Sequence, residues 1–190
     1  MSMTGSLWLG ILLVAVLYAV MLYNGLVEVK HAVAKHWANI DVVLKQRYDE
    51  LPKLIETCKQ YQQFEAGTLQ KVTQARAQAH DARLRQDVPA LGQAEAALRA
   101  GLGQVFAVVE RYPELRADEA FQTLMSRITA LENAIADRRE LYNEAVNINN
   151  VRIEKFPDAV LARAFGFGAR PLLEFAEAEK ADVDVKALFN

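Results

Sequence analysis

Cysteine, glycine, proline and net charge are all scarce in this 190-residue sequence. The single cysteine, Cys58, has no second thiol with which to form an intramolecular disulfide, so the fold does not depend on an oxidising compartment. Nine glycines and five prolines are too few for a loop-rich or disordered chain. The 22 Lys and Arg nearly balance the 24 Asp and Glu, whereas a nucleic-acid-binding protein carries a basic excess. We therefore expect a compact helical protein with no nucleic-acid partner.

Charged side chains are absent from residues 1–27, and Glu28 is the first. Within this stretch, residues 7–23 are almost wholly apolar and would form roughly 25 Å of helix. With their uncharged flanks they reach the ~30 Å hydrocarbon thickness of a bilayer. Trp8 near one end, with Tyr18 and Tyr23 toward the other, is typical of the aromatic belts at membrane interfaces. The pattern predicts a transmembrane helix.

The alternatives to a retained membrane span are a buried core helix and a cleaved signal peptide. A buried core helix of a soluble protein would normally show a polar stripe, and this segment has none. A cleaved signal peptide needs a basic start and a small-x-small cleavage site. No Lys or Arg precedes the apolar run, and residues 20–23, at its exit, are bulky. We expect an uncleaved single span.

Basic residues follow the apolar run but do not precede it. They are Lys30, Lys35, Lys45 and Arg47. By the positive-inside rule this asymmetry places the C-terminal part of the chain in the cytoplasm. The expected location is therefore the inner cell membrane, with the larger domain on its cytoplasmic side.

After the span, apolar residues recur at steps of three and four, which predicts amphipathic helices. We expect the first to run on from the membrane to about Tyr48, either continuous with the span or broken at Asn24-Gly25. Pro52 should interrupt it, because proline removes a backbone donor, and should start the second helix. That helix should carry Cys58, Tyr61, Glu65 and Arg76 along its apolar side. A third should begin at Pro89 near a capping Asp87, and a fourth should run from a capping Asp118 to Phe156.

Four amphipathic helices with short links bury their stripes most simply as an antiparallel bundle. The expected fold class is all-α: an N-terminal transmembrane helix that continues into a four-helix bundle. The expected domains are an anchor over residues 1–27, the bundle over 28–157 and a C-terminal segment over 158–190. That segment is apolar and basic at first and then acidic. It either packs back on the bundle or lies at the membrane surface or on a partner.

A series of short motifs follows the span in a defined order. Trp37 is followed by Ile40-Asp41, then by Leu44-x-x-Arg47-x-Asp49 and Leu51-Pro52. The later members are Tyr61, Glu65, Val72, Ala75-Arg76, Tyr112-Pro113-x-Leu115, Leu131-Glu132, Arg139, Tyr142-Asn143, Asn149 and Phe156-Pro157. In this order and spacing the sequence resembles the LemA family of bacterial membrane proteins. It departs from the family pattern at Lys53, where Asn is usual, and at Phe64, where His is common.

The resemblance implies a single-pass anchor with a cytosolic four-helix bundle and no defined biochemical activity. A relative in magnetosome-forming bacteria is associated with membrane remodelling, which indicates scaffolding.

Some polar residues lie on or beside the apolar stripes of the predicted helices. A buried charge is tolerated only when it is paired, so these residues are candidates for a structural network of ion pairs and hydrogen bonds. A ligand or partner site, or simple solvation, are the alternatives for the same residues. The candidates are Asp41, Arg47, Glu65, Arg76, Glu132, Arg139, Tyr142, Asn143 and Asn149.

No motif indicates catalysis, a metal or a cofactor. Four-helix-bundle di-iron sites use two Glu-x-x-His pairs, and only Glu28-x-x-His31 has that spacing. Cys58 occupies an apolar helical position, where an inert core thiol is usual. The sequence contains no Gly-x-Ser-x-Gly elbow and no phosphate-binding loop.

We therefore expect a non-enzymatic scaffold or interaction protein. Its partners would be the lipid bilayer, a second copy of the chain and an unidentified protein. The alternative is a sensor or regulatory subunit that signals through a continuous first helix.

Overall fold

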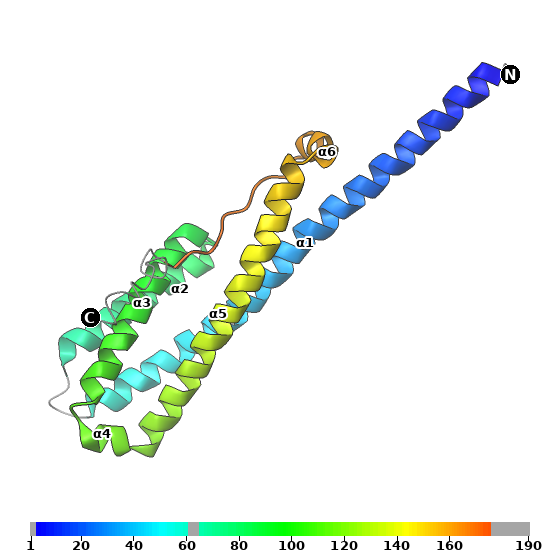
Figure 1. The fold of residues 1–190 in the computed structure, drawn as a ribbon. Coiled ribbons are helices and arrows are strands. Elements are labelled where there is room, and N and C mark those ends of the chain that lie inside the picture. The colour runs from blue at the N-terminus through cyan, green and yellow to red at the C-terminus, as the bar shows by residue number, and fades with distance from the viewer. Residues whose placement is uncertain (1–2, 61–64, 176–190) are drawn as a thin grey trace, which may run out of the picture. The chain divides into compact units, whose positions relative to one another are not determined.

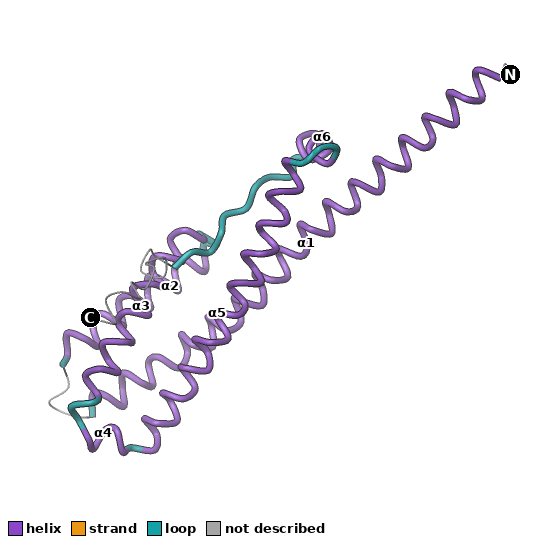
Figure 2. Tube along the Cα trace, viewed as in Figure 1, coloured by secondary structure: helices purple, strands orange, loops and turns teal. Residues whose placement is uncertain are grey.

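The structure, a computed structural model, describes residues 3–60 and 65–175, and every regular element in these ranges is a helix (Figures 1 and 2). The prediction of an all-α protein is confirmed. Tyr61 and the acidic residues after Phe175 lie outside the described residues. The elements are α1 (Met3–Lys59), α2 (Ala66–Leu84), α3 (Val88–Val109), α4 (Pro113–Ala117), α5 (Glu119–Glu154) and α6 (Asp158–Phe165).

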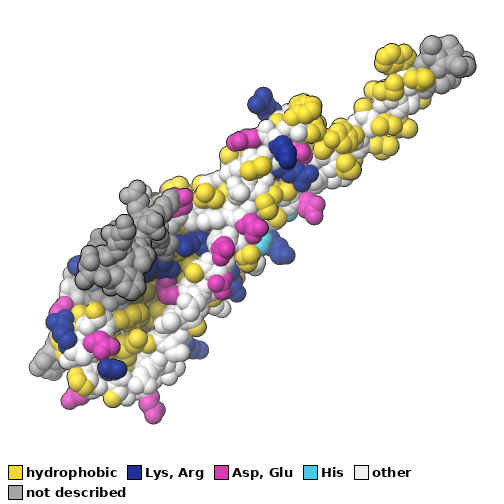
Figure 3. Space-filling model, viewed as in Figure 1, with side chains coloured by type: hydrophobic (Ala, Val, Ile, Leu, Met, Phe, Trp, Pro, Cys, Tyr) yellow, Lys and Arg dark blue, Asp and Glu magenta, His cyan; other side chains and the backbone are white. Residues whose placement is uncertain are grey.

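The N-terminal part of α1 carries the apolar run predicted to span a membrane. Its large side chains from Leu7 to Tyr23, apart from Leu22, are exposed, and Figure 3 shows hydrophobic side chains along this part of the helix. Only 6% of its most apolar stretch is buried. By length and composition, α1 is the one helix within the described ranges that could cross a membrane. It is not broken at Asn24-Gly25.

The chain forms two compact units, and α1 and α5 each contribute to both. The N-terminal unit contains α1 as far as Ile40 together with residues 138–172. The bundle unit contains residues 41–137 together with the segment that begins at Leu173. The apolar helix therefore packs against later helices of an antiparallel bundle, as the sequence predicts.

In the bundle unit, helices adjacent along the chain run antiparallel. Asp41 and Tyr48 of α1 meet Arg83 and Arg76 of α2, in reversed order. Between α2 and α3, Glu65, just before α2, pairs with Arg111, just after α3. α5 returns alongside α1, where Glu50 pairs with Arg127 at 3.5 Å. The core between the four helices is made of large apolar side chains that include Leu44, Leu51, Leu54, Val72, Leu91, Leu98, Phe121, Ile128 and Ile135.

Pro52 does not end the first helix, so the predicted boundary there is wrong. α1 continues to Lys59, and the second helix begins at Ala66. A proline inside a helix leaves the carbonyl four residues earlier without its backbone donor, and here that carbonyl belongs to Tyr48. The Nε of Arg76 donates to this oxygen at 2.7 Å. A side chain from α2 thus replaces the missing backbone hydrogen bond.

Both predicted N-caps are confirmed. Asp87 precedes α3, and its carboxylate accepts a hydrogen bond from the Ala90 backbone N–H at 3.1 Å. Asp118 precedes α5 and accepts from the Phe121 N–H at 2.8 Å. Each carboxylate satisfies an N–H that the first turn of its helix leaves free. The short α4 lies between α3 and Asp118 and was not predicted.

In the N-terminal unit, α1 and α5 also run antiparallel. The Trp37 ring lies 5.6 Å from the Tyr142 ring, and Nη1 of Arg152 donates to the Gly25 carbonyl at 2.9 Å. A Cβ on Gly25 would come within 2.2 Å of the Arg152 guanidinium, so a larger residue there would require the Arg152 side chain to move. Beyond α5, the chain turns through α6, which is followed by Gly166 in the left-handed conformation (φ 71°).

The role of Arg76 can be tested with Pro52→Ala, which restores the backbone donor for the Tyr48 carbonyl. In the natural chain, Arg76→Met should destabilise by about 2 kcal/mol, because a carbonyl inside the bundle loses its partner. In the Pro52→Ala background the same change should cost about 1 kcal/mol less. Urea unfolding of the detergent-solubilised chain measures both values. Equal costs in the two backgrounds would show that Arg76 does not compensate for Pro52.

Candidate functional site

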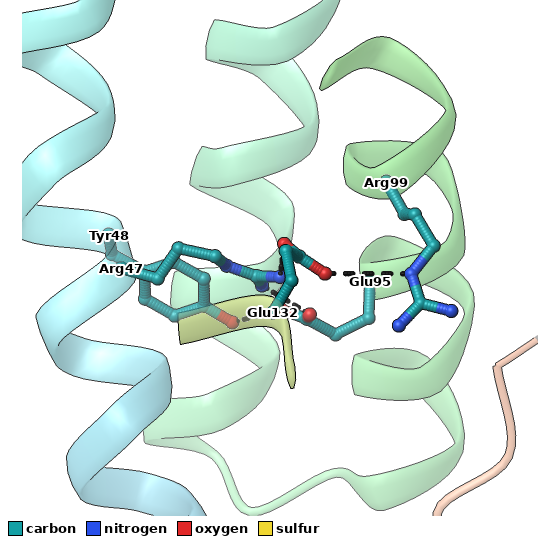
Figure 4. Close-up of polar contacts among 5 residues, drawn as sticks. All are labelled: Arg47, Tyr48, Glu95, Arg99 and Glu132. Carbon is teal, nitrogen blue, oxygen red and sulfur yellow. Dashed lines mark hydrogen bonds and ion pairs between the residues drawn. The ribbon is translucent and has the colours of Figure 1, made fainter. Parts of the chain in front are cut away.

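A cluster of charged and phenolic side chains lies inside the bundle unit (Figure 4). α1 supplies two of them, α3 supplies two and α5 supplies one. We call it the ionic cluster, and it consists of Arg47, Tyr48, Glu95, Arg99 and Glu132.

Arg47 lies at the centre of the ionic cluster. Its guanidinium donates through Nη2 to Oε2 of Glu95 and through Nη1 to Oε1 of Glu132. The side chains of Arg47 and Glu95 are each 1% exposed, whereas Glu132 is 19% exposed. One arginine of α1 therefore holds a carboxylate of α3 and a carboxylate of α5.

The remaining carboxylate oxygens are also occupied. The Tyr48 hydroxyl donates to Oε1 of Glu95, and Nε of Arg99 lies 3.5 Å from Oε2 of Glu132. Two cations thus face two carboxylates: three carboxylate oxygens accept hydrogen bonds, and the fourth, Oε2 of Glu132, is in an ion pair with Arg99. A buried ion pair is tolerated when its charges balance and its carboxylate oxygens are paired, and both hold here, while the buried Nε of Arg47 has no hydrogen-bond partner.

The pKa values follow from this arrangement. Burial alone would lower the pKa of the Arg47 guanidinium, but Glu95 and Glu132 together raise it above its ordinary value. Burial raises the pKa of the Tyr48 phenol, and the Glu95 carboxylate raises it further. Arg47 therefore stays charged and Tyr48 stays protonated, so both remain hydrogen-bond donors to Glu95 at every physiological pH.

The other predicted network residues on α1 and α2 lie outside the ionic cluster. Asp41 pairs with Arg83 at 2.8 Å, and Arg76 holds the Tyr48 carbonyl. Glu65 is not within the second helix as predicted. It is an exposed residue just before α2, where it pairs with Arg111 at 2.7 Å.

Tyr142 and Asn149 belong to the N-terminal unit, where they hold the segment after α6. The Tyr142 hydroxyl donates to the Pro171 carbonyl at 3.1 Å, and Asn149 Nδ2 donates to the Gly168 carbonyl at 3.2 Å. Asn150 both donates to and accepts from the Arg170 backbone, at 2.9 Å each. We call Tyr142, Asn149 and Asn150 the amide clamp. Arg139 and Asn143 are half-buried on α5 in the same unit.

Cys58 is buried near the end of α1, and burial raises the pKa of its thiol to about 12. The thiol is therefore protonated at neutral pH and a poor nucleophile. Among the described residues, His, Cys, Asp and Glu side chains form no group of three or more that could hold a metal ion.

Sequence reasoning missed Glu95, Tyr48 and Arg99. Glu95 follows Leu91 by four residues and precedes Leu98 by three, so it lies on the apolar stripe of its helix. That position was the available signal for a buried carboxylate. Tyr48 was taken as the end of a helix, and Arg99 resembles any surface arginine in sequence.

The fold and the ionic cluster define a class: helical-bundle proteins in which a candidate membrane helix continues into a bundle held by buried charges. Within this class, the chain belongs to the LemA family, whose family model matches residues 36–187. The expected family resemblance is confirmed.

Protein LemA and two magnetosome proteins are similar to parts of the chain. Protein LemA of Metamycoplasma hominis is 26% identical over 152 residues, which cover 80% of this chain and 68% of that protein. Magnetosome protein MamQ 2 of Paramagnetospirillum magneticum is 39% identical over 66 residues, and MamQ of Magnetospirillum gryphiswaldense is 35% identical over 66 residues. Each of these two matches covers 35% of this chain and 24% of the magnetosome protein. The chain thus spans about a quarter of their length.

The burial of the ionic cluster predicts a graded response to loss of charge. Glu95→Gln should destabilise the chain by about 3 kcal/mol, because the buried Arg47 loses its most buried counter-charge. Glu132→Gln should cost roughly half as much, since Glu132 reaches solvent and an exposed arginine. The matched control is Glu56→Gln, at an exposed position on α1, which should change stability by less than about 0.5 kcal/mol. Urea unfolding followed by circular dichroism gives the three values. A Glu95→Gln variant as stable as the control would refute a structural role.

Proposed function

We propose that the chain is a non-enzymatic scaffold or interaction protein at the bacterial cytoplasmic membrane. The apolar part of α1 crosses the bilayer once, and the bundle lies on the cytoplasmic side. This orientation is supported by Lys30 and Lys35, which follow the apolar run, while residues 1–6 contain no basic side chain. Its partners are the bilayer, a second copy of the chain and a further protein, with no nucleic acid and no cofactor.

The saturation of the ionic cluster carries this proposal. Three oxygens of the two carboxylates accept hydrogen bonds from the protein itself, and the fourth is in an ion pair with Arg99. Tyr48 and Arg47 are held in their ordinary protonation states. A general acid or base needs a pKa near the working pH and a proton it can exchange with substrate. The hydrogen bonds of these groups instead connect α1, α3 and α5. The ionic cluster is therefore typical of a structural network and not of a catalytic site.

Self-association is supported by an exposed apolar seam on α5. Leu141, Ile148 and Val151 are all exposed, and their spacings of seven and three residues place them on one side of the helix. This is the spacing by which two helices form a coiled coil. A second copy of the chain, presenting the same seam, would bury these side chains in a symmetric contact.

A cysteine at the seam tests self-association in the membrane. Ile148→Cys should form a disulfide-linked dimer under mild oxidation, while Gln93→Cys, exposed on α3, should not. The native Cys58 does not interfere, because it is buried and protonated at neutral pH. Adding Leu141→Asp should reduce the dimer at least about fivefold, since a charge enters an apolar seam. Gel electrophoresis and crosslink mass spectrometry measure it, and an equal yield from both cysteines would contradict the seam.

Turnover of a substrate would overturn the scaffold proposal outright. The finding required is an activity of the detergent-purified chain that Glu95→Gln or Arg47→Met abolishes at unchanged helical content.

The continuity of α1 supports a second candidate, a sensor or regulatory subunit. One uninterrupted helix of 57 residues contains both the apolar run and two members of the ionic cluster. A rigid helix can carry a shift or rotation from the membrane to the packing around Arg47.

Inserting Gly-Gly after Asn24 separates this candidate from a passive anchor. In the natural chain, moving from thin to thick bilayers should change hydrogen exchange in residues 41–59, because the helix transmits the displacement. The insertion should abolish that change and leave membrane insertion intact, since glycine interrupts the helix without adding charge. Hydrogen-exchange mass spectrometry in nanodiscs of two thicknesses measures this. If hydrogen exchange in the natural chain does not change with bilayer thickness, the sensor hypothesis is wrong.

A further inference from the structure

The segment around the end of α6 lies beside the last turn of the apolar run. The Tyr23 ring is 4.9 Å from the Phe165 ring and 5.9 Å from the Phe167 ring. Tyr23 closes the apolar run, and Glu28, the first charged residue, follows five residues later. Five helical residues rise only about 7.5 Å. If α1 spans a bilayer, the end of α6 therefore lies at the level of the lipid headgroups.

A cavity of about 320 Å³ lies at this level, between α1 and the segment after α6. Lys30 and His31 line it from α1, and Arg170 lines it from the opposite segment. The Nζ of Lys30 is 5.9 Å from the centre of the Phe167 ring. The cavity thus combines two basic side chains with aromatic walls. Its aromatic lining comes from Tyr23, Phe165 and Phe167.

The wall that carries Arg170 is held in place by side chains of α5. The amide clamp bonds the carbonyls of residues 168, 170 and 171 and also the Arg170 N–H. Gly166, in the left-handed conformation, turns the chain at the end of α6, and the Phe167 N–H donates to the Ala162 carbonyl at 2.9 Å. A defined backbone therefore presents Arg170 to the cavity.

The surface around α6 is apolar and basic. Phe156, Val160 and Phe165 are 80%, 60% and 61% exposed, and Lys155 and Arg163 of the same stretch are also exposed. Hydrophobic and basic side chains lie next to one another around α6 in Figure 3. Three acids are nearby: Asp158 is paired with Arg152 at 3.3 Å, whereas Glu28 and Glu154 are exposed. Apolar residues among basic ones are typical of segments that lie on anionic membranes.

We propose that the α6 region, residues 155–170, docks on the membrane surface, and that Lys30 and Arg170 bind the phosphate of an anionic phospholipid in the cavity. The inference rests on the proposed anchoring by α1. Anchoring sets the depth of the cavity, and at that depth the neighbour is the headgroup layer. Phe156, Val160 and Phe165 then enter the acyl boundary, where their exposure no longer costs hydrophobic free energy.

Fluorescence quenching in nanodiscs tests the docking on the full chain. An environment-sensitive maleimide is attached at Val160→Cys, and Cys58 stays unlabelled because it is buried. The discs contain phosphatidylcholine alone or with about one-third phosphatidylglycerol, and a quencher sits high on the acyl chain. The label should be quenched and blue-shifted in the anionic discs. A label at Gln93→Cys, on α3, should respond to neither lipid.

Charge variants test the role of the cavity. Lys30→Gln/Arg170→Gln should lower the ratio of docked to undocked label in anionic discs at least about tenfold, because each basic residue near an anionic surface contributes severalfold in affinity. The matched control, Lys59→Gln/Arg85→Gln, removes two exposed cations of the bundle unit and should leave the ratio unchanged. Quenching that is equal in both lipids, or unchanged by Lys30→Gln/Arg170→Gln, would overturn headgroup binding.

A third label separates this inference from the anchoring on which it rests. A label at Leu12→Cys, within the apolar run, should be quenched by a quencher deep in the bilayer in both lipids and in every variant. If this label is quenched and the label at position 160 is not, the docking of α6 is wrong and the anchor stands. If the label at position 12 is not quenched, the anchor itself is wrong.

Discussion

The burial of the Arg47 guanidinium is the constraint on which the bundle depends. A cation that is 1% exposed must find anionic partners inside the protein, since its loss of hydration is otherwise too costly. Its two partners come from α3 and α5, so satisfying one side chain brings together three helices. Apolar burial drives the bundle to form, and the ionic cluster restricts which registers it can adopt, because a slipped helix would leave a buried charge unpaired.

The same constraint explains why α1 continues past a proline. Arg47 and Tyr48 lie one turn before Pro52, and the Tyr48 carbonyl is the one that Pro52 leaves without a donor. Arg76 fills that gap from α2. The turn of α1 that carries Arg47 and Tyr48 is therefore held in two ways. Glu95 and Glu132 bind its side chains, and Arg76 of α2 binds its backbone. The apolar residues that follow, Leu54 and Cys58, can then enter the core as part of α1.

Helical periodicity, capping residues and the charge-free N-terminus were enough to predict the all-α class, the candidate span and both aspartate caps. These features depend on residues close together in the sequence. The boundary at Pro52 was not predictable from local rules, because its compensation comes from Arg76, in another helix. Glu95 was missed for a related reason: a carboxylate on an apolar stripe is recognised as buried only when its partner is known. Likewise, nothing local indicated that Asn149 and Asn150 hold residues 168–170.

The central claim is that Arg47 and Glu95 stabilise the chain only as a pair. The most direct test is a double-mutant cycle with Arg47→Met, Glu95→Leu and the combined variant, measured by urea unfolding of the full chain in detergent. Each single change should cost about 3 kcal/mol or more, because it leaves one buried charge without its partner. The combined variant should be at least as stable as the less damaged single variant, which gives a coupling energy above about 2 kcal/mol. A combined loss equal to the sum of the two single losses would contradict the account.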